Sequence, residues 1–265
     1  ARTFQNIRLF KDLTVLDNVK AGLHNHYSYS AVEGIFRMPR YFKMESAMNE
    51  RAMELLKVFE LDEEAGYLAA NLPYGKQRKL EIARALATKP KILLLDEPTA
   101  NLDPESRAQI FRMIVRISRE EHMTVIIVEH NIKEIIDEVD WVIGLDRRGT
   151  KIADCPKDEA GDIFRREVSA EYADACPGRQ ASNARGAQEG SSEVILDISH
   201  LSFAYPVPGK KREKGKQILD DFHMQVHKQD FLAIVGENGV GKSTLMKLIL
   251  KVCRPYSGSV RLYGK

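Results

Sequence analysis

The chain has 265 residues, of which 43% are hydrophobic and 29% are charged, as in an ordinary soluble globular protein. A formal net charge of +2 gives no reason to expect nucleic acid or a membrane surface as a partner. Three scattered cysteines, Cys155, Cys176 and Cys253, are too few for a disulfide framework or a metal site, which favours a reducing, cytoplasmic setting.

Residues 1–166 alternate short apolar runs with helical patterns, which is typical of a parallel α/β sheet. Buried strands are expected over residues 91–96, 123–128 and 141–145. Helices are expected over residues 78–88, 104–120 and 133–139. The chain starts at Ala1 without a signal peptide and inside a patterned segment, so we expect a truncated start.

The strand over residues 91–96 ends in Asp96-Glu97-Pro98. Two adjacent carboxylates at the end of a buried strand cost free energy unless they meet a metal or a hydrogen-bond donor. Asp96 is suited to hold Mg²⁺ through water, and Glu97 to orient or deprotonate an attacking water. Taken alone, these two residues have an alternative interpretation, in which they are an acid pair that only caps the next element.

The second part of the chain begins after a change in composition. Residues 170–193 are rich in Ala, Gly, Ser, Asn and Gln, which predicts a flexible linker. A strand pattern restarts at residues 194–198, and the basic stretch 209–215 follows it. That stretch is most simply a solvated hairpin tip, with a surface for an anionic partner as the alternative.

A glycine-rich loop stands between an expected strand at residues 231–235 and an expected helix at 245–250. It matches the phosphate-loop pattern G-x-x-x-x-G-K-[ST], in which glycines let backbone N–H groups surround phosphates at a helix N-terminus. Lys242 would reach the β- and γ-phosphates, and Ser243 would ligate Mg²⁺. The loop residues assigned to nucleotide are Gly236, Asn238, Gly239, Gly241, Lys242, Ser243 and Thr244.

Together these segments resemble the ATP-binding cassette (ABC) transporter ATPases. Residues 72–77 resemble the LSGGQ signature of that family, residues 93–98 its Walker B strand, and residues 100–103 its D-loop. His130 is similar to the switch histidine, Gln5 to the Q-loop glutamine, and Tyr205 to the aromatic residue that stacks on adenine. The signature departs from LSGGQ at Pro73, Tyr74 and Lys76, whereas Gly75 keeps the position where the backbone must be approached closely.

The resemblance implies a P-loop NTPase fold of ABC type, with a mainly parallel sheet, a helical signature subdomain and an antiparallel β subdomain. It implies ATP and Mg²⁺ as cofactors, with Glu97 and His130 catalytic and Asp96, Ser243 and Gln5 serving the metal. The residues that it places on nucleotide outside the phosphate loop are Leu72, Tyr74, Gly75, Gln77, Asp103 and Tyr205. It implies a second cassette and membrane permease subunits as partners, on the cytoplasmic face of the cell membrane, and no nucleic acid.

Different parts of the chain resemble different ABC groups. Residues 1–24 and the signature look like the branched-chain amino-acid importers, whereas the sequence from Pro98 onward looks closer to cobalt-type or energy-coupling-factor ATPases. This mixed character raises the hypothesis that two genes are joined near Asp96.

The motifs also stand in an unusual order, because in these ATPases the phosphate loop comes first. We therefore interpret residues 1–166 as the back of one cassette, 167–193 as a linker and 194–265 as the front of a second cassette. This arrangement predicts a piece of a tandem-cassette ATPase that drives solute uptake, weakly active or inactive as an isolated chain. The alternatives are a circular permutant, an inert fragment, or a soluble tandem ATPase that acts on ribosomes or DNA.

Overall fold

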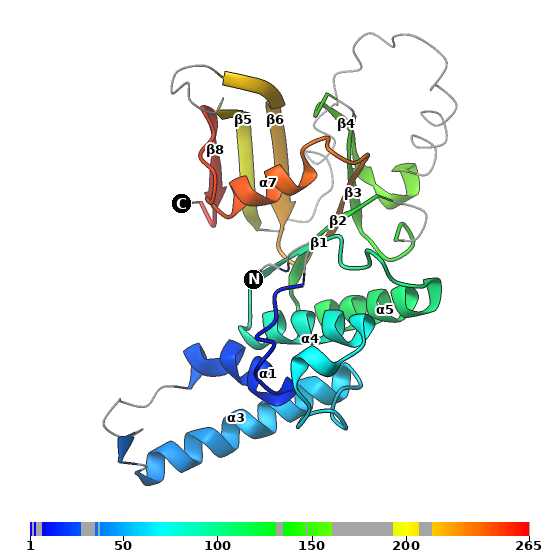
Figure 1. Ribbon diagram of the computed structural model, residues 1–265. Coiled ribbons are helices and arrows are strands. Elements are labelled where there is room, and N and C mark those ends of the chain that lie inside the picture. The colour runs from blue at the N-terminus through cyan, green and yellow to red at the C-terminus, as the bar shows by residue number, and fades with distance from the viewer. Residues whose placement is uncertain are drawn as a thin grey trace. The chain divides into compact units, whose positions relative to one another are not determined.

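The computed structural model describes residues 1, 3, 7–27, 35–36, 38–130, 135–146, 148–160, 193–206 and 214–264. The chain divides into two compact units, Ala1–Ile117 and Ser118–Lys265 (Figure 1), and each is described by itself. Among the described residues, none of the helices combines the length and the apolar character that a membrane crossing requires.

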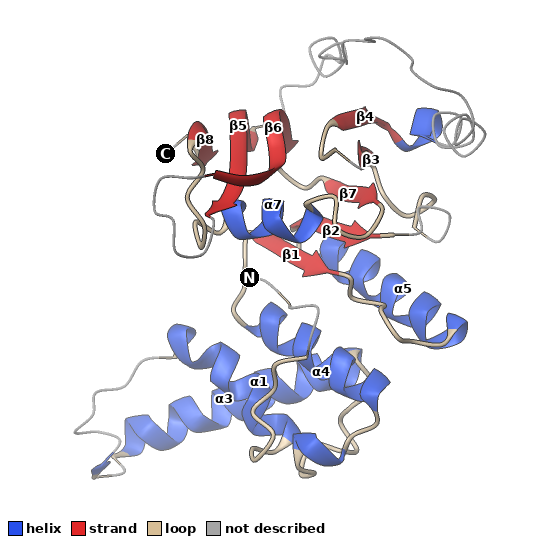
Figure 2. Cartoon of the chain, turned by 45° about the horizontal axis from the view of Figure 1, so that its top comes forward, coloured by secondary structure: helices blue, strands red, loops and turns tan. Residues whose placement is uncertain are grey.

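The first unit is built mainly of three helices, α1 (Val15–Leu23), α3 (Pro39–Val58) and α4 (Tyr74–Ala87), which lie together in Figure 2. Short 3₁₀ turns, η1 (His24–His26) and η2 (Ala69–Asn71), connect them. At Gly22 the backbone of α1 passes so close to α4 that a Cβ would lie 2.5 Å from the Arg84 carbonyl oxygen. Glycine is needed there by this close approach.

The start of α1 is fixed by two polar side chains. The Thr14 hydroxyl accepts a hydrogen bond from the Asp17 N–H at 3.0 Å, a standard N-cap. The fully buried Asn18 side chain accepts from the Phe10 N–H at 3.0 Å and donates to the Phe10 and Thr14 carbonyls, at 2.9 Å each. The loop before α1 is therefore held by buried, satisfied hydrogen bonds.

The helix predicted from Arg78 begins four residues earlier, at Tyr74, so that prediction was wrong at its start. Pro73 is the N-cap, and its carbonyl accepts the first helical hydrogen bond from the Gln77 N–H at 2.9 Å. Gly75 therefore lies in the first turn of α4. A helix can include a glycine there when the residues that follow are good helix formers.

The helix α4 leads to β1 (Ile92–Asp96), which confirms the predicted acidic strand. Its residue Leu94 exchanges backbone hydrogen bonds with residues at the start of the chain, the Thr3 N–H donating to the Leu94 carbonyl at 3.0 Å. The next helix, α5 (Pro104–Glu120), has the predicted bounds. Asp103 caps it, because its carboxylate accepts from the Ser106 N–H at 2.9 Å.

The second unit contains strands from both parts of the sequence in one sheet. Its order within the unit is β2 (Thr124–Glu129), β7 (Phe231–Gly236), β3 (Trp141–Leu145) and β4 (Lys151–Pro156). β7 is parallel to both neighbours, and its Ile234 is paired with Val128 on one side and Ile143 on the other. The strand that precedes the phosphate loop therefore lies between two strands that come before residue 166.

The helix predicted over residues 133–139 is not seen in the described part of that segment, where residues 135–138 form a turn. The turn is closed by the Val139 N–H, which donates to the Ile135 carbonyl at 3.2 Å. Asp140 then bonds to β7 twice, donating its N–H to the Phe231 carbonyl at 2.8 Å and accepting the Phe231 N–H at 3.0 Å. These two bonds attach Asp140 to β7 directly before β3 begins, so the helix does not continue to this point.

A second, antiparallel sheet has the order β6 (Lys214–His227), β5 (Val194–Pro206) and β8 (Ser257–Leu262). Pro206 is paired with Lys214, so residues 207–213 connect two antiparallel strands, as expected of a hairpin. The helix α7 (Lys242–Ile249) lies beside these strands, since Gly241 at its N-cap is next to Ile218 of β6 (Figure 1).

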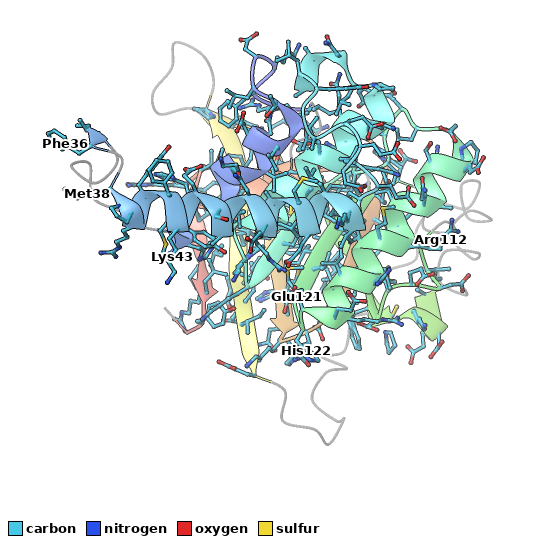
Figure 3. All side chains as sticks on the ribbon, turned by 90° about the horizontal axis from the view of Figure 1, so that it is seen from below. Phe36, Met38, Lys43, Arg112, Glu121 and His122 are labelled. Atoms are coloured by element: carbon cyan, nitrogen blue, oxygen red, sulfur yellow. The ribbon has the colours of Figure 1, made fainter. Side chains whose placement is uncertain are left out.

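Several sequence predictions lie outside the described residues, namely Gln5, residues 170–192 of the predicted linker and the basic residues 210–212. Of the aromatic-rich segment before α3, Figure 3 shows Phe36 at the N-terminal end of that helix, next to Met38. Both side chains are exposed, 71% for Phe36 and 42% for Met38.

Candidate functional site

The phosphate loop is shaped by two glycines that its own surroundings require. At Gly236 a Cβ would lie 2.6 Å from the Leu145 carbonyl oxygen of the neighbouring strand. Gly241 has φ +110°, and a Cβ there would lie 2.8 Å from Ile218 Cγ2. Side chains at either position would displace the loop, so these glycines fix the path from β7 into α7.

Lys242 closes this loop from inside. Its side chain is only 4% exposed, and Nζ donates to the carbonyls of Gly236 and Glu237, at 2.7 Å each. A third contact joins Nζ to His130 Nδ1 at 3.2 Å. The lysine therefore connects the loop to the end of β2, where the predicted switch histidine stands.

The contacts of His130 define how its ring is used. Nδ1 lies 3.2 Å from the Lys242 ammonium and 3.4 Å from the Gly236 carbonyl oxygen. Because an ammonium can only donate, the shorter contact makes Nδ1 an acceptor, and the proton of the neutral ring is then on Nε2. His130 is exposed, so the Nε2–H group is placed to donate to an incoming anion.

Tyr205 lies against the other side of the loop. Its hydroxyl is 3.2 Å from Thr244 Oγ1, and the Lys247 ammonium is 5.9 Å from its ring centroid. Phe203 meets the ring edge-on at a centroid distance of 4.9 Å. With 40% of Tyr205 exposed, the ring offers a held apolar face beside the loop, as stacking on a base requires. The remaining loop residues are Asn238 and Gly239, both exposed, and the half-buried Ser243 in the first turn of α7.

In the first unit, Asp96 and Glu97 stand at the end of β1 and are 1% and 6% exposed. Glu97 has φ +48°, a left-handed conformation that costs a non-glycine residue roughly 1–2 kcal/mol. Such strain persists only where the surroundings impose it.

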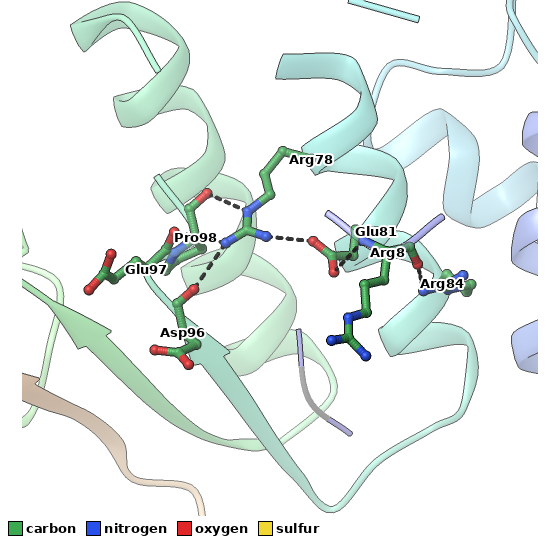
Figure 4. A network of polar contacts seen from close by, with 7 residues as sticks. All are labelled: Arg8, Arg78, Glu81, Arg84, Asp96, Glu97 and Pro98. Atoms are coloured by element: carbon green, nitrogen blue, oxygen red, sulfur yellow. Dashed lines mark hydrogen bonds and ion pairs between the residues drawn. The ribbon is translucent and has the colours of Figure 1, made fainter. Parts of the chain in front are cut away.

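The group that imposes this conformation is Arg78 of α4, for which the sequence predicted only a position at the start of a helix. This guanidinium is 1% exposed and donates to three carbonyls in a row: Asp96 at 3.0 Å, Glu97 at 2.7 Å and Pro98 at 2.9 Å. Figure 4 shows both carboxylates pointing away from the guanidinium. Arg78 therefore holds the backbone of the acidic turn through its carbonyls and does not contact the two carboxylates.

A buried carboxylate balances that charge. Glu81, 2% exposed, accepts from Arg78 Nη1 at 2.5 Å, and its other oxygen lies 3.5 Å from the Arg8 N–H. Arg84 in turn donates to the Arg8 carbonyl. The available sequence signal was an arginine and a glutamate three residues apart on the apolar helix that follows the signature.

The signature residues occupy the first turn of α4 and the residues before it. Leu72 is buried, Tyr74 is 40% exposed, and the Gln77 side chain donates to the Leu72 carbonyl at 2.8 Å. A Cβ at Gly75 would meet only Leu102 Cδ2, at an ordinary 3.7 Å. Within the described part of this unit, no atom therefore excludes a side chain at position 75.

The predicted D-loop residue Asp103 has a local role that accounts for its position. Hydrogen bonds from the Ser106 hydroxyl and N–H lower the pKa of its carboxyl group. It caps α5 as an ionised side chain, which is favourable at a helix N-terminus.

The structure thus assembles the predicted residues into two sets. The second unit brings together Tyr205, residues 236–244 and His130. The first holds Leu72 to Gln77, Asp96, Glu97 and Asp103.

The profile of one family, described as "ABC transporter", matches residues 1–100 and 219–265, which is more than half of the chain. The chain belongs to the ABC transporter family. Its fold is that of an ABC-type P-loop NTPase, with a mixed, mainly parallel sheet, an antiparallel sheet and a helical part.

Two relatives show how much of a longer ABC protein this chain aligns with. The high-affinity branched-chain amino acid transport ATP-binding protein BraF of Pseudomonas aeruginosa is 35% identical over 161 residues, covering 61% of this chain and 63% of BraF. The chain thus spans less than two thirds of that relative. A putative ABC transporter ATP-binding protein of Methanosarcina mazei is 30% identical over 257 residues, covering 95% of this chain but 44% of the relative.

Among solved structures, a nucleotide-free ATP-binding cassette from an ABC transporter is similar, with a TM-score of 0.52 and 27% identity. The similarity covers 64% of this chain and 66% of that cassette. It confirms the predicted ABC fold, whereas the site roles of the individual residues remain predictions.

Proposed function

We propose that this chain is part of the ATP-binding, ATP-hydrolysing subunit of an ABC importer. The observation that carries the proposal is the position of Lys242, whose ammonium joins the phosphate-loop carbonyls to His130. Membership of the ABC transporter family and the similarity to BraF, a branched-chain amino acid transport ATP-binding protein, support a role in solute uptake.

The loop is suited to bind the phosphates of ATP. Phosphate oxygens would compete with the Gly236 and Glu237 carbonyls for the Lys242 protons, while α7 presents its N-terminal N–H groups. His130 would donate its Nε2–H to the γ-phosphate, and Tyr205 would stack on the adenine. Ser243, Asp96 and Gln5 have the oxygen ligands that suit Mg²⁺, which when bound neutralises charge on the phosphates.

Glu97 is the residue that we propose as general base toward the attacking water. Its carboxylate is buried, and the three carbonyl contacts of Arg78 hold the backbone on which it stands. A fixed backbone limits the positions open to the carboxylate, and hydrolysis depends on such positioning.

Gly75 and the first N–H groups of α4 would meet the γ-phosphate held by another cassette. The absence of any steric need for glycine within its own unit supports this role. Partners of the whole protein would then be a second cassette and permease subunits at the cytoplasmic face of the membrane.

For the parent protein we propose a tandem of two cassettes, with residues 1–166 from the first, 167–193 as linker and 194–265 from the second. The Methanosarcina mazei relative supports this, because almost the whole chain aligns with less than half of that protein. In the isolated chain, β7 lies between β2 and β3, so parts of both proposed cassettes share one sheet. We expect weak nucleotide binding and little turnover from it.

Nucleotide binding tests the proposed site directly. Titration of the purified chain with Mg-ATP should give binding that Lys242→Ala weakens about 10- to 100-fold, since a hydrogen bond to a charged group contributes about 1.5–3 kcal/mol. The matched control is Lys228→Ala, which replaces an exposed lysine of the same unit. This variant should bind Mg-ATP as tightly as the unmutated chain does. Equal affinity in the Lys242→Ala chain would refute the site.

Turnover tests the proposed state of the isolated chain. The isolated chain should release phosphate from ATP about as slowly as its Glu97→Gln variant, because little turnover is expected from either protein. Robust hydrolysis that this variant abolishes would show that the chain completes a working site by itself.

Cleavage between the proposed cassette parts tests the shared sheet. A protease site placed between residues 167 and 193 should yield two pieces that stay together in size-exclusion chromatography, because β7 pairs on both edges with the other piece. Separation of the pieces without denaturant would contradict this arrangement.

A further inference from the structure

Two histidines and an aspartate converge on the antiparallel sheet, away from the phosphate loop residues. His200 belongs to β5, and Asp221 and His223 belong to β6. Asp221 Oδ1 lies 2.8 Å from His200 Nδ1 and 3.3 Å from His223 Nε2. All three potential ligand atoms lie within 4.8 Å of one another.

The backbone brings them together through two register shifts. Between the pairs Ile198↔Met224 and Leu201↔Phe222, β5 has two residues and β6 has one, which is His223. In the next interval, between Leu201↔Phe222 and Phe203↔Leu219, β6 has two residues and β5 has one. Extra residues of this kind redirect side chains, and here the two shifts follow one another along the strand pair, with the extra residue first on β5 and then on β6.

Each shift contains a strained residue that contributes to the cluster. His200 has φ +53° and Asp221 has φ +46°, both left-handed. Conformations of this kind cost non-glycine residues roughly 1–2 kcal/mol. Neither position is glycine, so the side chains are retained in spite of the strain, and such outliers often mark a functional role.

Neighbouring contacts fix the cluster on one face of the sheet. Leu201 and Phe222 are buried, whereas His200, Asp221 and His223 have side-chain exposures of 73%, 67% and 41%. Lys151 Nζ donates to the His223 carbonyl at 2.9 Å. The ligand atoms are therefore accessible from solvent while the backbone that bears them is held.

We propose that His200, Asp221 and His223 form a binding site for a divalent first-row transition-metal ion, with Zn²⁺ as the representative ion. Two imidazoles and one carboxylate are ligands that such ions prefer, with water completing the coordination. Bonds of about 2.1 Å in tetrahedral geometry separate neighbouring ligand atoms by about 3.4 Å. The observed separations of 2.8 Å and 3.3 Å require only a small opening of the cluster.

The protonation of the three groups is compatible with binding. Asp221 lies within hydrogen-bonding distance of both imidazoles, as an accepting carboxylate does. For His200 Nδ1 and His223 Nε2 to ligate, each ring proton must move to the other nitrogen of its ring. The hydrogen bonds of both imidazoles to Asp221 are then replaced by bonds to the ion, and His223 also gives up the 3.4 Å contact with the His200 N–H. The competing interpretation is an aspartate that simply accepts hydrogen bonds from both imidazoles.

A bound ion would link β5 to β6. The same strand β5 carries Tyr205 beside the phosphate loop, so metal binding would stabilise the sheet that presents this ring. This inference is independent of the proposed ATPase function, because it depends only on residues of the antiparallel sheet.

The test is calorimetric titration of the chelator-treated, full 265-residue chain with ZnCl₂ in the presence of millimolar Mg²⁺. We expect one ion per chain and an affinity that His200→Asn, Asp221→Asn and His223→Asn each weaken about tenfold or more, as loss of a ligand does. The matched control is His122→Asn, an exposed histidine at the C-terminal end of α5 (Figure 3) that also has positive φ. Its affinity should be unchanged.

A measurement on the unmutated chain covers the case in which a variant fails to fold. Zinc-dependent NMR shifts should be confined to residues 199–202 and 220–224 and to the imidazole protons of the two ligands. No zinc binding, equal binding by all three variants, or shifts confined to other residues would overturn the proposal.

Discussion

The phosphate loop and the signature segment each have a glycine at the start of a helix, Gly241 as the N-cap of α7 and Gly75 in the first turn of α4. The two glycines nevertheless stand in opposite environments. At Gly241 the chain itself excludes a side chain, through φ +110° and the nearby Ile218. At Gly75 the chain leaves room for one. The phosphate loop thus takes its shape from its own unit, whereas no described atom of the first unit excludes a side chain at position 75.

The largest expected effect concerns Arg78, which supports the acidic turn next to the signature helix. Arg78→Met should reduce the free energy of unfolding of the first unit by about 3–5 kcal/mol, because it leaves buried Glu81 and three carbonyls without their donor. Urea unfolding followed by circular dichroism measures the change.

Arg51→Met is the matched control, since Arg51 pairs with exposed Glu54 on α3. It should cost no more than about 1 kcal/mol. Similar losses in both variants would show that the buried network contributes no more than a surface pair.

Gly241→Ala should have the next largest effect. Alanine at a left-handed position costs about 1–2 kcal/mol, and displacement of Ile218 adds strain. The free energy of unfolding of the second unit should fall, and Mg-ATP affinity with it. Unchanged stability would mean that the loop does not require its glycine.

Gly75→Ala should act in the opposite direction on stability. Alanine inside a helix is favoured over glycine by about 0.5–1 kcal/mol, and the only neighbour of the added methyl is 3.7 Å away. Unfolding of the first unit should therefore shift to slightly higher urea concentration. A clear loss of stability would contradict the assignment of this glycine to an external contact.

The smallest expected effect concerns the reactivity of a cysteine thiol. It reports whether Cys155, in β4, is protected from solvent. Burial, together with Glu159 and Asp154, raises the pKa of the Cys155 thiol to about 11. The thiolate that reacts is therefore scarce at mildly alkaline pH and increases only as pH approaches that value. Mass spectrometry after iodoacetamide treatment should find half-exposed Cys253 alkylated well before Cys155.

Equal alkylation of the two cysteines would mean that β4 is open to solvent. Urea provides the internal control, because unfolding should remove the difference between the two sites.

Much of the local structure followed from sequence patterns. The strands around residues 92–96, 141–145 and 231–236 and the helix at 104–120 were predicted within a residue or so, since period and capping residues act over a few neighbours. The helix expected at 133–139 was wrong in its described part, because Asp140 bonds to β7, a partner ninety residues away in sequence. The start of α4 was predicted four residues too late, at Arg78 instead of Tyr74.

Short runs of contiguous residues were enough to predict the family, the phosphate loop and the unusual order of the motifs. Only the tertiary structure decided which strands flank β7, that Lys242 meets His130, and that Arg78 holds the acidic turn. The histidine–aspartate cluster belongs with these, because it depends on how two strands shift in register. Contacts between distant segments depend on pairing and packing, which no local pattern encodes.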